Sequence, residues 1–74
     1  MQVNVKLFAT LRDGRFKTKG TELKDDSRVI DVIKKYDLPE EEVAICLVNG
    51  RDADGDQMLQ DGDIVSLFPP VGGG

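Results

Sequence analysis

The sequence predicts an α+β domain in which a mixed sheet of four or five strands is covered by one main helix. Three observations indicate this class: residues 2–8 alternate polar and apolar, residues 42–48 form an almost continuous apolar run, and only one segment, between Asp25 and Pro39, has apolar residues at helical spacing. One helix is available to cover one face of such a sheet.

The first two predicted strands lie in the amino-terminal third of the chain. Residues 2–8 are predicted to be a half-buried strand, because every second side chain is apolar. Asp13-Gly14 then supplies residues that favour a turn. Residues 16–24 are polar and are interrupted by Gly20, and we interpret them as a strand that returns beside the first.

The helix is predicted after three residues that favour a helix start. Asp25, Asp26 and Ser27 offer side-chain oxygens and negative charge to the first free backbone amides. The apolar residues with helical spacing are Val29, Val32, Ile33 and Tyr36. The helix is expected to end before Pro39, because proline disfavours helical geometry in the residue that precedes it.

The apolar run at residues 42–48 predicts a strand that is central in the sheet and covered on both faces. Asn49-Gly50 follows it and favours a tight hairpin, since both residues tolerate the positive φ angles of a type I′ turn. Residues 51–59 are expected to return as a short, irregular edge.

The last predicted strand covers residues 64–68, after a turn at residues 61–63. Pro69 ends it, because proline lacks a backbone N–H donor. The predicted domain therefore spans residues 1–70, and residues 71–74 form a flexible, glycine-rich tail. The order of elements predicts a ubiquitin-like β-grasp roll.

Composition excludes several classes of function. The chain has 74 residues and one domain, with ten basic and fourteen acidic residues and a net charge of -4. Nucleic acid is a poor partner for this charge, whereas a protein with a basic docking surface is attracted. With Cys46 as the single cysteine and no histidine, the sequence excludes an internal disulfide and a Cys/His metal site or dyad.

The charged and apolar residues also indicate a location. No apolar run approaches the ~20 residues that a membrane-spanning helix needs. The first residues, MQVNVKLF, alternate in polarity and do not resemble a signal peptide, so a cytoplasmic protein without a membrane partner is expected.

Two stretches carry a resemblance to a known family: VKLFATLRD at residues 5–13 and LQDGDIVSLFPPVGGG at residues 59–74. They resemble the MoaD/ThiS family of ubiquitin-like sulfur carriers, and the second stretch is most similar to the small subunit of molybdopterin synthase. The matching residues are Phe8, Ala9, Arg12, Gly62, Asp63, Val65, Phe68, Pro69, Pro70, Val71, Gly73 and Gly74.

The chain also departs from that subunit at a few points. Asp13 stands where glutamate is usual, and Gly72 occupies a position that takes a small residue. The chain is slightly short for the subunit and nearer in length to the thiamine-type carriers, whose tails usually lack the Pro-Pro pair. The pathway that the carrier serves is therefore left open by the sequence.

The resemblance implies a chemistry for Gly74. An E1-like activating enzyme would use ATP to adenylate the Gly74 carboxylate, which would then become a thiocarboxylate and donate its sulfur. The second partner would be the large subunit of molybdopterin synthase or another sulfur acceptor enzyme. By this resemblance the chain is a carrier and not an enzyme, and it binds no cofactor permanently.

Three alternatives to a molybdopterin carrier remain open. The sulfur could serve thiamine synthesis or tRNA thiolation, or Gly74 could form isopeptide bonds with target lysines in a ubiquitin-like modifier. A third possibility is a plain interaction module whose tail has no chemistry.

The tail suits carboxylate activation. An α-carboxylate is ionised at neutral pH and is a poor electrophile, so sulfur cannot be attached without activation. Gly72 and Gly73 lack Cβ atoms and can pass through a narrow channel, while Pro69 and Pro70 restrict the exit direction. Together with Val71, these are the predicted tail-threading residues; residues 71–74 span roughly 13 to 14 Å when extended.

Phe8 and Phe68 are predicted to lie opposite the core-facing residues of their strands, which are Val3, Val5, Leu7, Val65 and Leu67. If the two strands are neighbours, the rings form an apolar docking patch beside the tail. The alternative is that the alternation assigned to the strands is wrong, or that the rings pack under a loop. Arg12 lies near the same end and is either a second docking residue, paired with partner carboxylates, or a solvated arginine.

Two other features are interpreted as structural. Cys46 lies within an apolar strand and is predicted to be a buried small hydrophobe rather than a sulfur acceptor. The residues Asp52, Asp54, Asp56 and Asp63 have the spacing of a calcium loop. However, Gln57 occupies the position that requires glycine, and strands rather than helices flank the loop, so no metal site is predicted.

Overall fold

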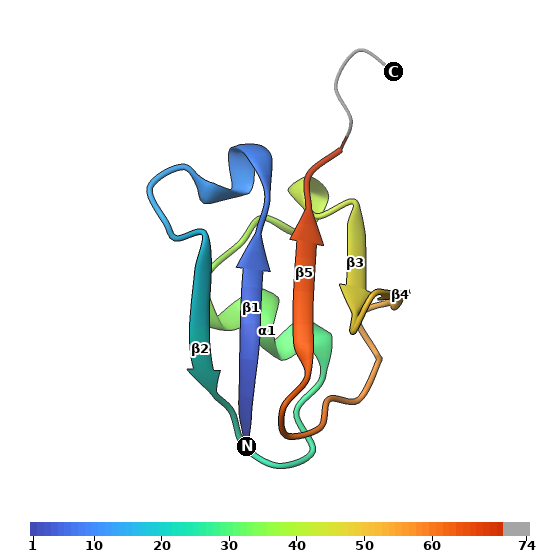
Figure 1. The fold of residues 1–74 in the computed structure, drawn as a ribbon. Coiled ribbons are helices and arrows are strands. Elements are labelled where there is room, and N and C mark those ends of the chain that lie inside the picture. Colours follow the sequence, from blue (N-terminus) through green and yellow to red (C-terminus); the bar gives the residue numbers. More distant parts are fainter. Residues whose placement is uncertain (71–74) are drawn as a thin grey trace.

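A computed structural model describes residues 1–70 of the chain, and Val71, Gly72, Gly73 and Gly74 lie outside the described residues. Figure 1 shows the elements, which comprise strands β1 (Gln2–Leu7), β2 (Thr18–Glu22), β3 (Ile45–Val48), β4 (Arg51–Asp52) and β5 (Ile64–Phe68) and helix α1 (Val29–Lys35). Two 3-10 helices, η1 (Ala9–Arg12) and η2 (Glu40–Glu42), lie in the connections.

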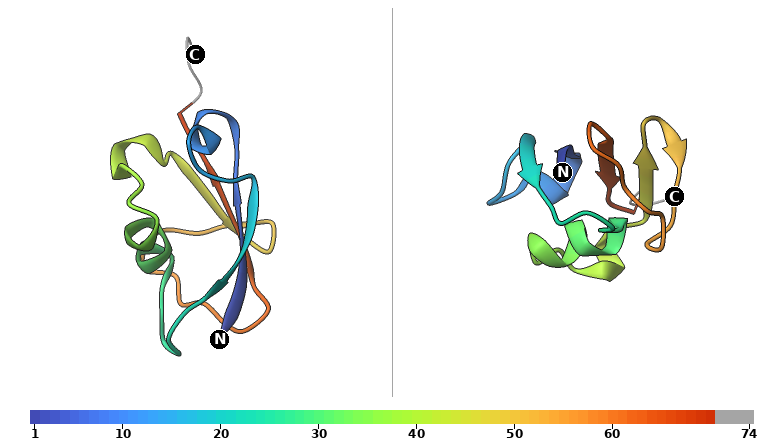
Figure 2. Two further views of the ribbon diagram at one scale, coloured as in Figure 1. Left: turned by 90° about the vertical axis from the view of Figure 1, so that its left-hand side faces the viewer. Right: turned by 90° about the horizontal axis from the view of Figure 1, so that it is seen from below.

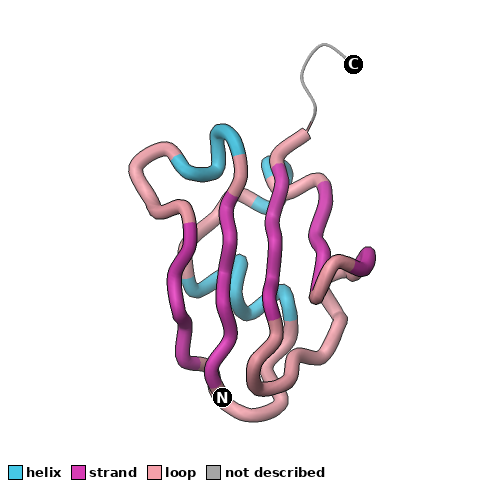
Figure 3. The backbone as a smooth tube through the Cα atoms, viewed as in Figure 1, coloured by secondary structure: helices cyan, strands magenta, loops and turns pink. Residues whose placement is uncertain are grey.

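The five strands form one sheet in the order β2-β1-β5-β3-β4 (Figures 1 and 3). β1 and β5 run parallel, and the other neighbouring pairs run antiparallel. α1 covers one face of the sheet, and no second helical layer covers the other face within residues 1–70 (Figure 2). The predicted α+β class, with a mixed sheet and one main helix, is therefore confirmed.

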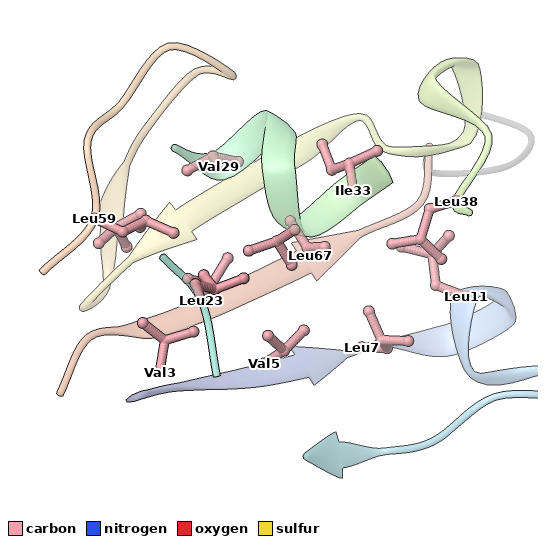
Figure 4. Packing of buried hydrophobic residues seen from close by; sticks show 13 residues of the cluster. Val3, Val5, Leu7, Leu11, Leu23, Val29, Ile33, Leu38, Leu59 and Leu67 are labelled. Carbon is pink, nitrogen blue, oxygen red and sulfur yellow. The ribbon is translucent and has the colours of Figure 1, made fainter. Parts of the chain in front are cut away.

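The core lies between the sheet and α1 (Figure 4). β1 contributes Val3, Val5 and Leu7, and β5 contributes Val65 and Leu67, all of them nearly or completely buried. The alternation along both strands follows from burial of a single face, because successive side chains of a strand point to opposite sides. The predicted core faces of these two strands are confirmed.

The prediction for the apolar run at residues 42–48 was wrong in three respects: the first residue of the strand, its position in the sheet and its cover on both faces. β3 begins only at Ile45, after η2, and it lies between β5 and the two-residue strand β4. The middle position belongs to β5. With helical cover on one face only, the other face of β3 is open, and Ile45 is 43% exposed.

The predicted cap of the helix was also wrong. α1 begins at Val29 with Arg28 at the N-cap, and the Arg28 backbone N–H donates to Asp31 Oδ2 at 2.8 Å. The carboxylate that caps the helix therefore comes from inside its first turn, as in a capping box, and not from the preceding Asp25, Asp26 or Ser27. The helix ends at Lys35, ahead of Pro39 as expected.

The turns around β4 and β5 follow the predicted chemistry. Asn49 and Gly50 have φ angles of 53° and 82°, as a type I′ hairpin turn requires. The Asn49 side chain also bonds to the start of β5: Nδ2 donates to Asp63 Oδ1, and Oδ1 accepts the Ile64 N–H, both at 2.8 Å. β2 is shorter than the predicted strand at residues 16–24.

No helix in the part of the chain that the structure describes is long and apolar enough to cross a membrane. The domain boundary at residue 70 and the assignment of residues 71–74 as a tail stay predictions.

Candidate functional site

The parallel pair β1–β5 brings the ends of two distant segments together. Phe8 directly follows β1 and Phe68 is the last residue of β5. Because parallel strands end at the same edge of a sheet, the two rings meet there and stack, with centroids 4.2 Å apart and an interplanar angle of 11°. The sequence predicts this juxtaposition, on the condition that the first and last strands are neighbours, as they are.

The stacked rings are part of a larger apolar surface. Phe8, Ile45, Phe68, Pro69 and Pro70, with Ala9 and Thr10, line a hollow of about 430 Å³. We call the first five of these residues the tail-side patch. Phe8 and Phe68 are both half-buried, so part of the stack remains accessible to solvent. Figure 1 shows this end of β5, where the chain leaves the sheet.

Ile45 belongs to the tail-side patch although it was not predicted as a site residue. It pairs with Phe68 in the β3–β5 register and is among the exposed large hydrophobic residues. From the sequence, Ile45 was assigned to a strand covered on both faces and was therefore expected to be buried. Its position opposite Phe68 brings it into the patch, and this position is known only once β3 and β5 are paired.

Pro69 and Pro70 follow β5 directly. The Ala44 N–H donates to the Phe68 carbonyl at 2.9 Å. Neither proline has a backbone N–H, so neither can donate a further ladder bond. The two prolines thus lie where the sheet ends and belong to the tail-side patch. The other predicted tail residues, Val71, Gly72, Gly73 and Gly74, lie outside the described residues.

Arg12 is placed beside the patch by η1. Its Nε donates to the Leu7 carbonyl at 2.7 Å, and its guanidinium carbon lies 5.3 Å from the centre of the Phe8 ring. This geometry supports the aromatic stack through a cation–π contact. It also orients the guanidinium at the rim of the patch, where its terminal N–H groups are available to a carboxylate. A role for Arg12, Phe8 or Phe68 in docking stays a prediction.

Cys46 contacts the edge of the core from β3 and is half-buried. Burial, with a smaller contribution from the negative charge of Asp54, raises the pKa of the Cys46 thiol to about 11. The thiolate is the nucleophilic form, so this environment disfavours sulfur chemistry at Cys46.

Alkylation of Cys46 is expected to be slow at neutral pH and to accelerate as the pH rises toward about 11. Because burial disfavours the charged form, the folded protein should hold about 100-fold less thiolate than an ordinary cysteine. Since the pKa of the thiol is higher in the folded state, the free energy of unfolding should also decrease as the pH rises above the unfolded-state pKa of 9.0. Intact-mass analysis of iodoacetamide adducts across the pH range measures the first effect, with urea-unfolded protein as the control. A folded-state midpoint equal to the unfolded one would contradict it.

The aspartates with calcium-like spacing have other roles. Asp63 accepts hydrogen bonds from Asn49 Nδ2 and from the Gln60 N–H, both at 2.8 Å, and Asp54 accepts the Asp56 N–H at 2.9 Å. Within residues 1–70, no group of three or more cysteine, aspartate or glutamate side chains is arranged to hold a metal ion. Asp54 and Asp63 therefore use their carboxylates to hold turns.

The comparisons with known proteins agree with this fold. Residues 5–74 match the model of the ThiS family. No curated protein matches the sequence. Among solved structures, a putative molybdopterin converting factor subunit 1 from Pyrococcus furiosus is 33% identical, with a TM-score of 0.75, over 96% of this chain and 99% of that chain.

Two further structures are similar over the full length of both chains. SAMP1, a small archaeal modifier protein from Haloferax volcanii, is 27% identical with a TM-score of 0.81. Subunit 1 of the molybdopterin-converting factor from Helicobacter pylori, solved in complex with subunit 2, is 24% identical with a TM-score of 0.70 and shows the fold alone. These neighbours confirm the predicted ubiquitin-like β-grasp fold.

Proposed function

This chain belongs to the MoaD/ThiS family of ubiquitin-like sulfur carriers, and from that premise we propose that its Gly74 carboxylate is the sulfur attachment site. ATP on an E1-like activating enzyme adenylates the carboxylate and releases pyrophosphate. A sulfur donor then displaces AMP and leaves a thiocarboxylate. In this proposal the folded domain is bound by the partner enzymes and the tail carries the reacting carboxylate. The chain acts in the cytoplasm, holds no cofactor of its own, and its partners catalyse the reactions.

The observation that carries the proposal is the position of the tail-side patch. β5 ends in Phe68, and Pro69 and Pro70 line the same apolar surface, so the segment that leads to Gly74 leaves the domain beside a surface fit for docking. A partner that covers the patch contacts Pro69 and Pro70, which precede the tail in the sequence. Phe8 supports the ring of Phe68 from β1, and Arg12 offers a charged contact at the rim.

Molybdopterin synthesis is the destination that we propose. The Pyrococcus furiosus neighbour is a putative subunit 1 of the molybdopterin converting factor, and the Helicobacter pylori structure pairs such a subunit with subunit 2. By this likeness the acceptor is a larger catalytic subunit that takes the thiocarboxylate tail. The Phe-Pro-Pro-Val stretch that precedes the terminal glycines also favours this destination over thiamine synthesis.

Whole-protein mass spectrometry tests the carrier chemistry. The chain is incubated with an activating enzyme, ATP and a sulfur source, and replacement of one oxygen by sulfur at the C-terminus is expected. An unchanged mass, under conditions in which an established carrier is converted, would sink the proposal. Co-purification from native lysate then distinguishes the pathways, because molybdopterin synthesis requires the large synthase subunit as the partner.

A protein modifier is the second candidate, favoured by the likeness to SAMP1 over 100% of both chains. The same activation step would then lead to an isopeptide bond between Gly74 and a lysine of a target protein. Adducts linked through lysine, in place of a thiocarboxylate, would support the modifier and contradict the sulfur carrier.

Phe68→Ala is expected to raise the KM for activation roughly tenfold or more, because a central aromatic residue often dominates the energy of an interface. Steady-state pyrophosphate release measures the change. The variant also loses the stack with Phe8, worth about 0.5–1.5 kcal/mol, so its thermal unfolding is measured in parallel. Met58→Ala is the control, since Met58 is 45% exposed and lies outside the tail-side patch. Equal KM values for the two variants would remove the patch from the docking surface.

A further inference from the structure

The outer edge of β2 is the longest free backbone edge in the sheet. β2 pairs with β1 on one side, and no strand of residues 1–70 pairs with its other side (Figure 3). The edge at the opposite end of the sheet is the two-residue strand β4. Free edges are templates for a further strand, and proteins commonly block them with prolines, bulges or a covering segment. β2 contains no proline, and its register with β1 is continuous.

The register with β1 determines which backbone groups are free. The Leu7 N–H donates to the Lys17 carbonyl at 3.0 Å, and the Leu23 N–H donates to the Met1 carbonyl at 2.9 Å. Hydrogen-bonded and non-hydrogen-bonded pairs alternate in an antiparallel ladder. The backbone groups of Thr18, Gly20 and Glu22 therefore point away from β1, toward solvent, at the spacing that an added strand requires.

Gly20 keeps the middle of this edge open. Within residues 1–70, no atom outside Gly20 and its two chain neighbours lies within 4 Å of the position that a Cβ atom at Gly20 would occupy. Gly20 also lines a hollow of about 230 Å³ on the outer face, with Gln2, Asn4 and Gly62. Glycine weakens a strand interior and often marks a site where another backbone approaches closely. At the centre of β2, Gly20 therefore presents no side chain to an approaching strand.

The helix side of the edge is partly aromatic and basic. Phe16 and Tyr36 meet edge to face with ring centroids 4.9 Å apart, and Lys19 Nζ lies 5.7 Å from the centre of each ring. A bond between Thr21 Oγ1 and the Tyr36 hydroxyl, at 2.6 Å, holds the edge strand to the end of α1. An incoming strand thus meets a rigid edge with apolar rings on one side.

The charge around β2 is opposite to that of the whole chain. Residues 15–24 contain four basic residues, Arg15, Lys17, Lys19 and Lys24, and one acidic residue, Glu22, whereas the whole chain has ten basic and fourteen acidic residues. A basic strip along a free edge attracts an acidic strand and repels a basic one. Because like charges repel, the basic strip also disfavours pairing of β2 with β2 of a second copy of the chain.

From this geometry we infer that β2 binds an extended acidic segment of a partner protein by strand addition. The main chain of the segment pairs with the backbone groups of Thr18, Gly20 and Glu22, its alternate apolar side chains contact the rings of Phe16 and Tyr36, and its flanking carboxylates meet the lysines. This interaction does not use Gly74 and is independent of sulfur transfer.

The test is a titration of the full ¹⁵N-labelled chain with the capped peptide EDVIVIDE, followed by NMR. Saturable shifts centred on the amides of Thr18, Gly20 and Glu22, with slower hydrogen exchange at these amides and weaker binding in salt, support the inference. Two control peptides are EDVPPIDE, whose prolines remove paired donors, and KKVIVIKK, whose charge is reversed; both should bind at least about tenfold more weakly.

Protein variants provide the second arm. Gly20→Pro removes a donor that faces the free edge and leaves the β1–β2 bonds in place, so it should abolish binding, while Gly20→Ala keeps the donor and should bind normally. If Gly20→Pro does not fold, a double variant with Lys17→Glu and Lys24→Glu replaces it and should weaken binding roughly fivefold or more.

Failure of EDVIVIDE to give saturable shifts, equal binding of EDVPPIDE, or shifts centred on the tail-side patch would overturn the inference. If the amide signals of β2 shift with protein concentration in the absence of peptide, the edge pairs with a second copy of this chain, and the inference is also overturned.

Discussion

Deletion of Gly74 is expected to abolish thiocarboxylate formation while leaving the fold intact. The shortened chain still ends in a glycine carboxylate, but the carboxylate is withdrawn by about 3.3–3.6 Å, the length of one extended residue. A displacement of even 1 Å at a reacting centre can reduce a rate about 100-fold, so activation should fall by at least that factor. Intact-mass spectrometry of the activation reaction measures the loss.

The control for this deletion is the folded state of the variant. Within residues 1–70, the strand that leads to the tail makes its last bond through the Phe68 carbonyl, which accepts the Ala44 N–H. Thermal unfolding of the deletion variant should therefore match that of the parent chain. A truncated chain that is converted to thiocarboxylate at the parent rate would show that the chemistry does not depend on the position of Gly74.

Leu67→Ala is expected to destabilise the domain by about 2–5 kcal/mol, the range for truncating a buried leucine. Leu67 is fully buried in β5, the strand that pairs with both β1 and β3, so the cavity would lie at the centre of the core. Since small domains are commonly stable by only about 5–15 kcal/mol, this loss is a large share of the total. Urea denaturation followed by circular dichroism gives the difference in unfolding free energy.

Ser66→Ala is the matched control, because Ser66 neighbours Leu67 in β5 but faces away from the helix and is half-exposed. Its free energy of unfolding should change by about 0.5 kcal/mol or less, as for most surface substitutions. A similar loss in both variants would mean that the two faces of β5 are equally buried, which contradicts the packing.

The strands that enclose the core were predictable because each buries only one face. In β1 this produces alternation of apolar and polar residues, which identifies the strand and the side that faces the helix. In β5 only Ser66 is polar, but Val65 and Leu67 still occupy the alternate positions that face the helix. The Asn49-Gly50 turn was predictable for a different reason, since few residues accept two successive positive φ angles. Local chemistry was sufficient in all three cases.

One error arose where the outcome depended on neighbours that are distant in sequence. The apolar run before Val48 fits either a central strand or a strand with one open face, and only the sheet order decides between them. The other error was local: the cap of α1 was assigned to the acidic residues before the helix, whereas Asp31, inside the first turn, caps it.

The candidate site was predicted in part. The stack of Phe8 on Phe68 depends on strand parity, which the sequence shows, and on the β1–β5 pairing, which the fold class supplied. Ile45 joins the same patch through its register with Phe68, which no local pattern reveals. The free edge of β2 likewise becomes visible only once the sheet order is known.

The central place of β5 has a consequence for synthesis of the protein. The middle strand of the sheet is the last to be made, so β1 and β3 have no common neighbour until Phe68 has left the ribosome. A nascent or prematurely terminated chain that stops short of this strand exposes the apolar faces of both and remains open to proteolysis. Translation must therefore reach residues 64–68 before the sheet can close, and a folded domain shows that this strand has been made.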